Sequence, residues 1–228
     1  MTTEKEAAAD YRSRQKRVGD VLRQETRNRL LEAAEAEFAA HGYAATTVTR
    51  LASAAGVSVQ TLYLAWGSKR ELLRGYMEKV LAGGAASPAD ASERFTEQMP
   101  PDRRLRELAH LVAEVAERAS TGWTLYRDAA AIDPEIAADW NELQLLRHQT
   151  FTTIIGAIPE DSLKPGLTRQ VAIDTAWAIA GPETFDLLVH RLGYTLDGFR
   201  DWLERTLPAA LLRTAPSGER SAAGGSDG

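Results

Sequence analysis

Residues 55–72 read AGVSVQTLYLAWGSKREL, and this stretch decides how the N-terminal part of the chain folds. Gly56 permits a sharp turn, because glycine adopts backbone conformations that other residues avoid. Ser58 follows as a helix N-cap and predicts a short helix. Three apolar residues share one face of this helix: Val59, Leu62 and Trp66. The opposite face is therefore expected to meet solvent or a partner.

The outward face of this helix carries side chains that suit a DNA groove. Gln60 can bond an adenine edge with both of its amide atoms, and Thr61 can bond a base or place its methyl group against thymine. The Tyr63 hydroxyl can bond a phosphate oxygen. Leu64 also faces outward. The pattern predicts a recognition helix.

Other helices surround this one in the sequence. Residues 24–41 carry an apolar stripe at spacings of three and four, and Gly42 ends that helix. Residues 46–55 form a short second helix ahead of the turn. Residues 68–82 begin with the capping-box pattern Ser-x-x-Glu and have an apolar face broad enough to contact both halves of the protein. Together these elements predict a helix-turn-helix unit followed by a connecting helix.

Helix starts on either side of the recognition helix offer phosphate contacts. Lys69 lies in the first turn of helix 68–82, where free backbone N–H groups and a fixed cation together favour a phosphate oxygen. Thr46 and Thr47 offer the same kind of contact at the preceding helix start. The predicted DNA-binding residues are Thr46, Thr47, Ser58, Val59, Gln60, Thr61, Tyr63 and Lys69.

Composition places the chain among ordinary globular proteins. Of its 228 residues, 44% are apolar and 26% are charged. The chain has no cysteine, which excludes a disulfide scaffold, a thiolate zinc site and a cysteine nucleophile. The N-terminus lacks the apolar segment of a signal peptide, and no run approaches the roughly 18 apolar residues that a membrane helix needs. We expect a cytoplasmic protein without a membrane partner.

Charge is distributed unevenly along the chain. Residues 1–82 hold thirteen Lys and Arg against ten Asp and Glu, whereas the remainder holds fourteen against twenty-two. This asymmetry indicates that a polyanion is bound by the N-terminal part. The arm before residue 24 adds Arg12, Arg14, Lys16 and Arg17, which suit either a minor groove or a solvated tail.

The rest of the chain reads as helical. No strand-like alternation, internal repeat or coiled-coil heptad run is present. Residues 83–101 are rich in Gly, Ala, Ser and Pro and predict a loop. Helical patterns cover residues 102–119, 122–131, 134–158, 168–191 and 195–212, with a bend in the fourth at Gly181-Pro182. The predicted fold class is all-α.

At this point the residues carry a family resemblance. The segment TTVTRLASAAGVSVQTLYLAWGSKRELL, residues 46–73, resembles the DNA-binding signature of the TetR family of bacterial transcriptional regulators. The likeness covers about residues 24–82. It departs from the family pattern at Gln60, where glycine is frequent, at Ala65, where histidine is common, and at Trp66, where phenylalanine is usual.

The resemblance implies a homodimer whose last two long helices form a four-helix interface. It also implies a ligand-binding domain after residue 83. The interface residues would be Phe185, Leu188, Val189, Leu192, Phe199, Trp202, Leu203 and Leu207. Two-fold symmetry would place two recognition helices about 34 Å apart on a palindromic duplex. The expected domains are a basic flexible arm (1–23), a DNA-binding domain (24–82), a ligand-binding and dimerisation domain (83–212) and a disordered tail (213–228).

Aromatic residues with polar tips suit a small-molecule cavity among the C-terminal helices. The candidates are Trp123, Tyr126, Trp140, His148, Phe151 and Trp177, although each also fits ordinary core packing. We expect a repressor that a small-molecule effector releases from double-stranded DNA.

Two alternatives come from other classes of protein. Glu107 and His110 have the spacing of one half of a carboxylate-bridged di-iron motif, which would indicate an all-α metal oxidase. No second copy of the motif is present, so a solvated helix face explains the pair better, and no cofactor or metal is expected. The other alternative is a helical protein-interaction module that does not bind DNA. No catalytic triad or glycine-rich phosphate loop stands out, so we expect no enzyme.

Overall fold

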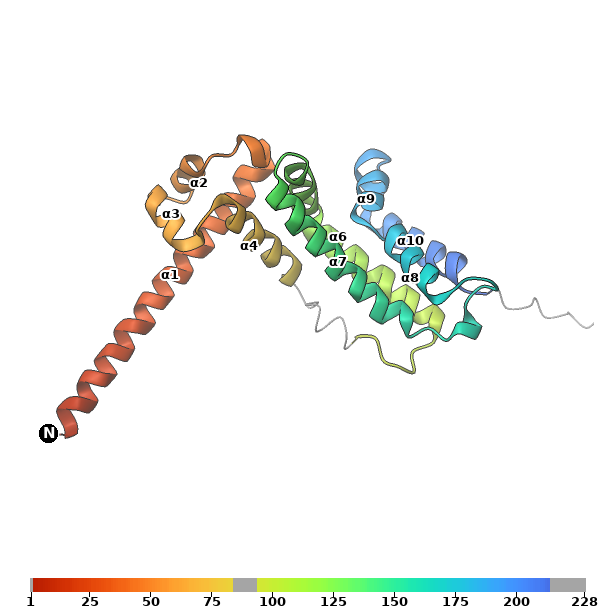
Figure 1. Ribbon diagram of the computed structural model, residues 1–228, viewed down its shortest axis with the longest axis horizontal. Helices are drawn as coiled ribbons and strands as arrows, with labels where there is room; N and C mark the ends of the chain where they lie inside the picture. The colour runs from red at the N-terminus through yellow and green to blue at the C-terminus, as the bar shows by residue number, and fades with distance from the viewer. Residues whose placement is uncertain (1, 84–93, 214–228) are drawn as a thin grey trace, which may run out of the picture. The chain divides into compact units, whose positions relative to one another are not determined.

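A computed structural model describes residues 2–83 and 94–213, with side chains from residue 19 onward (Figure 1). Within these residues the regular structure is helical, and the only β-type pairing is an isolated bridge between Leu163 and Leu212. The all-α prediction is therefore confirmed. The structure also has, among the described residues, no helix that is long and apolar enough to cross a membrane.

The helices follow one another along the chain. The first four are α1 (Thr2–Ala45), α2 (Val48–Ala54), α3 (Val59–Trp66) and α4 (Lys69–Ala82). The later ones are α6 (Pro101–Ala130), α7 (Pro134–Gly156), α8 (Arg169–Ile179), α9 (Pro182–Phe185) and α10 (Leu196–Leu211). A 3₁₀ turn covers Glu160–Ser162, and a π-helical turn covers Asp186–Arg191.

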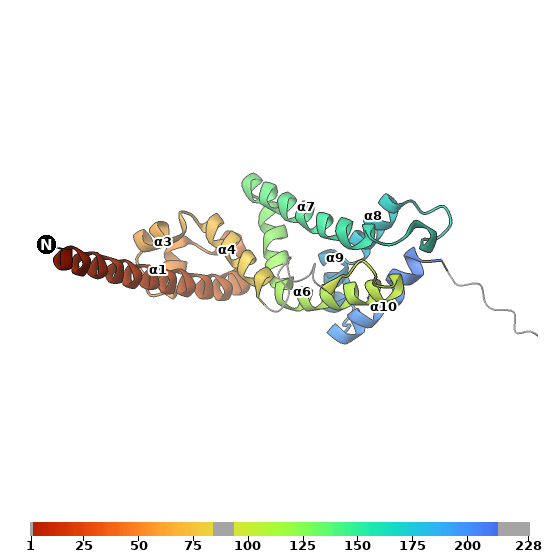
Figure 2. The ribbon, with the colours of Figure 1, turned by 90° about the horizontal axis from the view of Figure 1, so that it is seen from below.

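Helix α1 is longer than the sequence pattern predicted. Its helical backbone begins at Thr2 rather than at residue 24, and it extends beyond α2, α3 and α4 (Figure 2). The side chains of the arm before residue 19 lie outside the described residues, and so does the predicted tail from residue 214. At the other end, Gly42 has φ 72° and ψ 169°, which interrupts the helix where the sequence placed its end.

Helices α1 to α4 pack around one core. Leu30, Ala34 and Phe38 of α1 are buried, as the apolar stripe predicted. Leu62 of α3 and Leu72 of α4 are also fully buried against these neighbours. Burial of each such side chain stabilises the fold by roughly 1.5–3 kcal/mol. The inward face of α3 therefore contributes to the stability of this unit.

The turn between α2 and α3 forms as the sequence indicated. Gly56 has φ 65°, a backbone conformation that favours glycine. The amide of Val57 donates to the carbonyl of Ala52 at 2.9 Å, which closes the end of α2. Ser58 then caps α3, because its hydroxyl accepts from the amide of Thr61. These caps fix where the recognition helix begins.

The chain divides into two compact units. The first holds the described residues up to 83 together with 118–144, and the second holds residues 94–117 and 145–213. This division differs from the expected boundary near residue 83, because the segment 118–144 packs with the N-terminal helices. Helix α6 is also continuous through residues 120–122, where the sequence predicted a break between two helices.

Close packing at Gly122 accompanies the continuation of α6 through residues 120–122. A Cβ atom built on Gly122 would lie only 2.8 Å from the Sδ atom of Met77 in α4. The glycine therefore lets α4 and α6 approach closely within the first unit. Tertiary packing of this kind outweighs the low helix propensity of a Ser-Thr-Gly sequence.

In the second unit, the predicted helix 168–191 is interrupted rather than bent. Gly181 has φ −77° and ψ 159°, and it precedes Pro182 at the start of α9. A proline cannot donate an interior N–H, so the α8 ladder ends at Ile179. The chain then continues through α9 and the π-helical turn before α10 begins.

Most of the predicted dimer-interface residues belong to the core of the second unit. Phe185, Leu188, Phe199, Leu203 and Leu207 are buried within a single chain. Phe199, Leu203 and Leu207 turn inward where α10 packs against α8, whereas Phe185 belongs to α9 and Leu188 to the π-helical turn. Burial of these five side chains within one chain argues against their assignment to a dimer surface, which is corrected. The remaining three, Val189, Leu192 and Trp202, keep exposed surface, and Leu192 is 62% exposed.

We predict that Gly75→Ala destabilises the first unit. A Cβ on Gly75 would lie 2.2 Å from the ring of Trp66, so the ring must shift. Overpacking of this kind costs about 1–3 kcal/mol of unfolding free energy, more than the roughly 1 kcal/mol that alanine gains in helix propensity. Thermal or urea unfolding measures the difference.

Gly19→Ala is the matched control. This glycine also lies in a helix, and its nearest neighbour to an added Cβ is an Arg23 nitrogen at 3.7 Å. We expect Gly19→Ala to be neutral or stabilising. A Gly75→Ala protein as stable as wild type would contradict the close packing of Trp66 on α4.

Candidate nucleic-acid interface

The outer face of α3 is largely accessible to solvent. Gln60 is exposed, Tyr63 is 48% exposed and Leu64 is 82% exposed. Thr61 and Val59 keep part of their surface accessible. The helix thus presents polar and apolar side chains outward while Leu62 anchors it from below.

Hydroxyl groups fix the N-terminal tip of α3. Ser58 Oγ and Thr61 Oγ1 lie 2.8 Å apart and share a hydrogen bond. Ser58 Oγ also accepts from the backbone N–H of Thr61 at 3.0 Å. An N-cap of this type is worth about 1 kcal/mol, and here it orients both predicted contact residues.

The two threonines before α2 have different roles. Thr46 is fully buried, and its hydroxyl donates to the carbonyls of Gly42 and Glu37 at 2.8 and 3.2 Å. The prediction that its side chain contacts phosphate is therefore corrected. Thr47 is exposed and caps α2 by accepting from the amide of Arg50. Of these two threonines, Thr47 is the one whose side chain is accessible to a partner.

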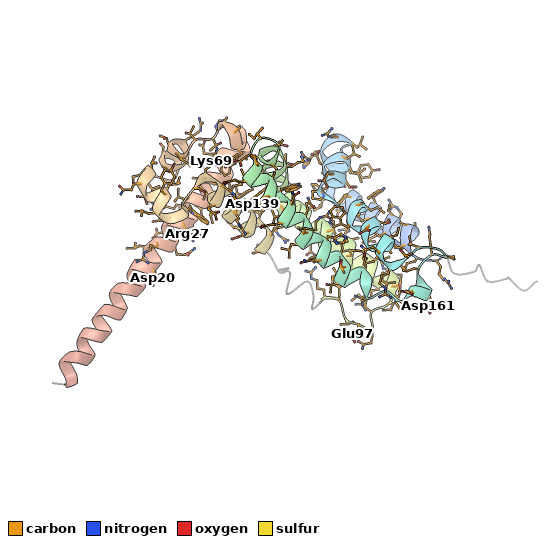
Figure 3. All side chains as sticks on the ribbon, in the orientation of Figure 1. Asp20, Arg27, Lys69, Glu97, Asp139 and Asp161 are labelled. Carbon is orange, nitrogen blue, oxygen red and sulfur yellow. The ribbon has the colours of Figure 1, made fainter. Side chains whose placement is uncertain are left out.

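Lys69, labelled in Figure 3, is the first residue of α4. Its Nζ donates to the carbonyls of Tyr43 and Thr46 at 2.9 and 3.0 Å. The same ammonium lies 3.9 Å from the centroid of the Tyr43 ring. Burial lowers the pKa of Lys69 and raises the pKa of Tyr43 to about 12. A lysine has three N–H donors, so one donor is left for an anion after these two bonds.

The C-terminal end of α3 is fixed by a residue that sequence reasoning did not single out. The Arg27 guanidinium stacks over the Trp66 ring, 3.6 Å from its centroid, and donates to the carbonyl of Ala65. A cation at a helix C-terminus is favourable, and stacking on tryptophan adds to this. Because Arg27 and Ala65 are 38 positions apart, no local pattern could reveal the contact.

An ion pair joins α4 to α7 within the first unit. The guanidinium of Arg70 donates two hydrogen bonds to the carboxylate of Asp139, both at 2.7 Å, and a third to Glu135 at 3.0 Å. Asp139 is only 5% exposed. The hydrogen bonds to Asp139 raise the pKa of Arg70 further above its usual range. Arg74 lies 3.9 Å from the same carboxylate. The sequence patterns of α4 and α7 did not predict the ion pair between Arg70 and Asp139.

The predicted ligand-lining aromatics fall into both units. In the first unit, Trp123 and Trp140 meet edge to face with centroids 5.5 Å apart. Tyr126 is fully buried, and its hydroxyl has no hydrogen-bond partner among the described residues. Burial raises the pKa of this phenol, and the charge of Asp139 contributes.

The other three aromatics lie in the second unit between α7 and α8. His148 pairs with Asp174 at 2.8 Å and meets Trp177 edge to face. Phe151 is buried, and the guanidinium of Arg147 lies 5.4 Å from its ring centroid. These contacts describe packing, and a ligand role for the six aromatics stays a prediction.

The metal-oxidase alternative gains no support from the structure. His110 of α6 pairs with Glu204 of α10 at 3.0 Å. In the parts of the chain that the structure describes, no three His, Asp or Glu side chains gather in a way that could hold a metal ion. The Glu107-x-x-His110 pattern is best explained as part of a solvated helix face.

Comparison with known proteins bears on the N-terminal region. Residues 30–76 match the model of the family described as bacterial regulatory proteins, tetR family. Over 69 residues, the chain is 39% identical to the HTH-type transcriptional repressor SCO4008 of Streptomyces coelicolor. That match covers 30% of this chain and spans only 36% of the length of the curated relative.

Solved structures share the fold over most of the chain. The native structure of NalD, the secondary repressor of the MexAB-OprM multidrug efflux pump in Pseudomonas aeruginosa, has a TM-score of 0.67 at 22% identity. The similarity covers 84% of this chain and 98% of NalD. A putative TetR-family regulator from Rhodococcus sp. has a TM-score of 0.62 at 18% identity, covering 82% and 99% of the two chains.

We predict that Asp139→Asn lowers the free energy of unfolding by about 2–4 kcal/mol, since it leaves the Arg70 charge without its buried counter-charge. Chemical denaturation with a helical circular dichroism signal measures this. The control is Glu135→Gln, which removes the second partner of Arg70 at a carboxylate whose side chain is 73% exposed. It should change stability by less than about 0.5 kcal/mol. Equal effects of both substitutions would refute the special role of Asp139.

Proposed function

We propose that this chain is a DNA-binding transcriptional regulator rather than an enzyme, and that it acts as a repressor, because residues 30–76 match the model of the tetR family of bacterial regulatory proteins. One observation carries the proposal. The outer face of α3 leaves Gln60, Tyr63 and Leu64 accessible, while Lys69 is held beside it at the start of α4. Leu62 packs α3 on the core, so the opposite face is available to a partner.

The chemistry of this face suits the major groove. An α-helix fits the groove, where the Gln60 amide can pair with adenine N6 and N7. Tyr63 and Lys69 supply contacts to phosphate oxygens, which position the helix without reading sequence. The N-terminal excess of basic residues favours the same partner.

The proposal includes a homodimer. A single recognition helix binds weakly, and two copies related by a two-fold axis read two half-sites about 34 Å apart. Val189, Leu192 and Trp202 are the predicted interface residues that keep accessible surface in the single chain. The operator is then expected to be palindromic.

The proposed control of DNA binding is a small-molecule effector. Helix α4 follows the recognition helix, and Arg70 fixes α4 to Asp139 of α7. Helix α7 contributes residues 134–144 to the first unit and 145–156 to the second. An effector that binds better to a shifted α7 would therefore act on α4 through this ion pair. Release of DNA then follows from the differential affinity of the effector for two states.

Similar proteins support the regulatory reading. SCO4008 is named a transcriptional repressor, and NalD is named the repressor of a multidrug efflux pump. Transfer of the repressor role to this chain rests on the N-terminal match and on the shared fold. The effector of this chain stays open.

Selection of bound fragments from the source genome tests the proposal. The purified full chain is mixed with a genomic fragment library, and retained fragments are sequenced. We expect a small set of fragments with a shared palindrome, bound with an affinity that falls steeply as salt concentration rises. Absence of salt-sensitive binding to any fragment would refute the proposal and favour a protein-interaction module.

We predict that Gln60→Ala relaxes base preference at one position of each half-site. The loss of the bidentate adenine contact should cost about 1–3 kcal/mol of binding free energy on the selected operator and less on variants at that position. Titration by fluorescence anisotropy measures this. Gln149→Ala, an exposed glutamine on α7, is the matched control and should bind like wild type. An equal loss on every sequence would contradict base reading by Gln60.

We predict that Lys69→Ala weakens binding to all sequences alike. The substitution removes a phosphate contact, so the slope of log affinity against log salt should fall by about one. It also removes the two bonds to the Tyr43 and Thr46 carbonyls, so unfolding must be measured in parallel. A sequence-dependent loss would contradict a phosphate contact.

A further inference from the structure

We propose that Leu64 is a specificity-determining residue that recognises the C5-methyl group of a thymine in the operator. This inference rests on the proposed function, since it names a further contact of the same recognition helix. It assigns one apolar side chain to one apolar chemical group on DNA.

The first observation is the exposure of Leu64. Its side chain is 82% exposed, the highest value among the exposed large hydrophobic residues that the structure describes. Leu62, two positions earlier on the same short helix, is fully buried. Leu64 therefore contributes little to the core of its unit. Covering an exposed apolar group with a partner removes it from water and lowers the free energy of the complex.

The second observation is the position of Leu64 on α3. It lies four residues after Gln60 and three after Thr61, so the three side chains share one face of the helix. Four residues of helix rise about 6 Å, and base pairs are about 3.4 Å apart. Leu64 is thus placed to meet the groove within about two base-pair steps of the base that Gln60 reads.

The chemistry of the groove selects the target. Base edges in the major groove present hydrogen-bond donors and acceptors, and the one apolar group among them is the thymine C5-methyl. A leucine cannot form hydrogen bonds with the other base edges. A site that pairs Gln60 with adenine and Leu64 with a thymine methyl would favour an A·T-containing half-site.

The surroundings of Leu64 argue against a protein partner at this position. Tyr63, which is 48% exposed and carries a polar hydroxyl, adjoins it on α3, and Gln60 and Thr61 on the same outer face are polar. Val21, Leu22, Ile132, Leu145 and Leu192, which are also strongly exposed, lie on other elements. A protein interface needs a contiguous apolar centre, whereas a single leucine among polar side chains matches a methyl-sized target.

The experiment removes the methyl group alone. In the operator selected by the wild-type chain, each thymine of the half-site is replaced in turn by deoxyuridine, which differs only by lacking the C5-methyl. We expect one such replacement to weaken wild-type binding about fourfold, the effect of uncovering one methyl-sized group. The Leu64→Ala protein should bind the unmodified operator more weakly and should not respond to that replacement.

Two further variants complete the design. Leu64→Met keeps an apolar side chain of similar volume and should retain the response to deoxyuridine. Ile132→Ala removes an equally isolated apolar side chain, 64% exposed, from the turn after α6 and should behave like wild type. We expect each variant to fold, because both positions are exposed. Circular dichroism melting checks this.

The outcomes separate this inference from the proposed function. If the wild-type chain selects no operator, the proposed function fails. If it selects one, and each deoxyuridine replacement weakens wild type and Leu64→Ala by the same factor, the methyl contact is refuted while DNA binding stands. A loss in Leu64→Ala without any methyl dependence would instead place the side chain against the sugar-phosphate backbone and overturn the inference.

Discussion

The ion pair between Arg70 and Asp139 fixes α4 to α7 within the first unit. Its two short hydrogen bonds fix a guanidinium of α4 to a nearly buried carboxylate of α7. Such a pair is costly to break, because a buried charge would lose its partner. Since α4 directly follows the recognition helix, the position of α7 and the position of α3 are linked through one bidentate contact.

The recognition helix is short, so its ends need support from outside. Ser58 caps the N-terminal end, and Arg27 meets the C-terminal end by stacking on Trp66 and bonding the Ala65 carbonyl. Lys69 ties the next helix to the turn before α2. The contacts of Ser58 and Arg27 lie at the ends of α3, and those of Lys69 lie between α4 and the turn before α2. Gln60, Tyr63 and Leu64 stay exposed on the outer face, as the proposed reading of DNA requires.

Two glycines allow the helices of this unit to approach closely. Gly75 accommodates the Trp66 ring against α4, and Gly122 accommodates Met77 against α6. In the second unit, by contrast, Gly181 and Pro182 end α8 and redirect the chain into a π-helical turn. Glycine thus serves close packing in one unit and a break in the other.

The sequence by itself determined the helical class, the helix-turn-helix and the outward set Gln60, Thr61 and Tyr63, because periodicity, caps and a turn glycine are local signals. Only the tertiary structure decided that Thr46 is buried and that α6 is continuous. It also decided that Phe199, Leu203 and Leu207 of α10 serve the core rather than a free surface. The same holds for Arg70 with Asp139. These outcomes depend on side chains brought together from distant parts of the chain, and a local pattern cannot distinguish an apolar stripe that packs inward from one that meets a second subunit.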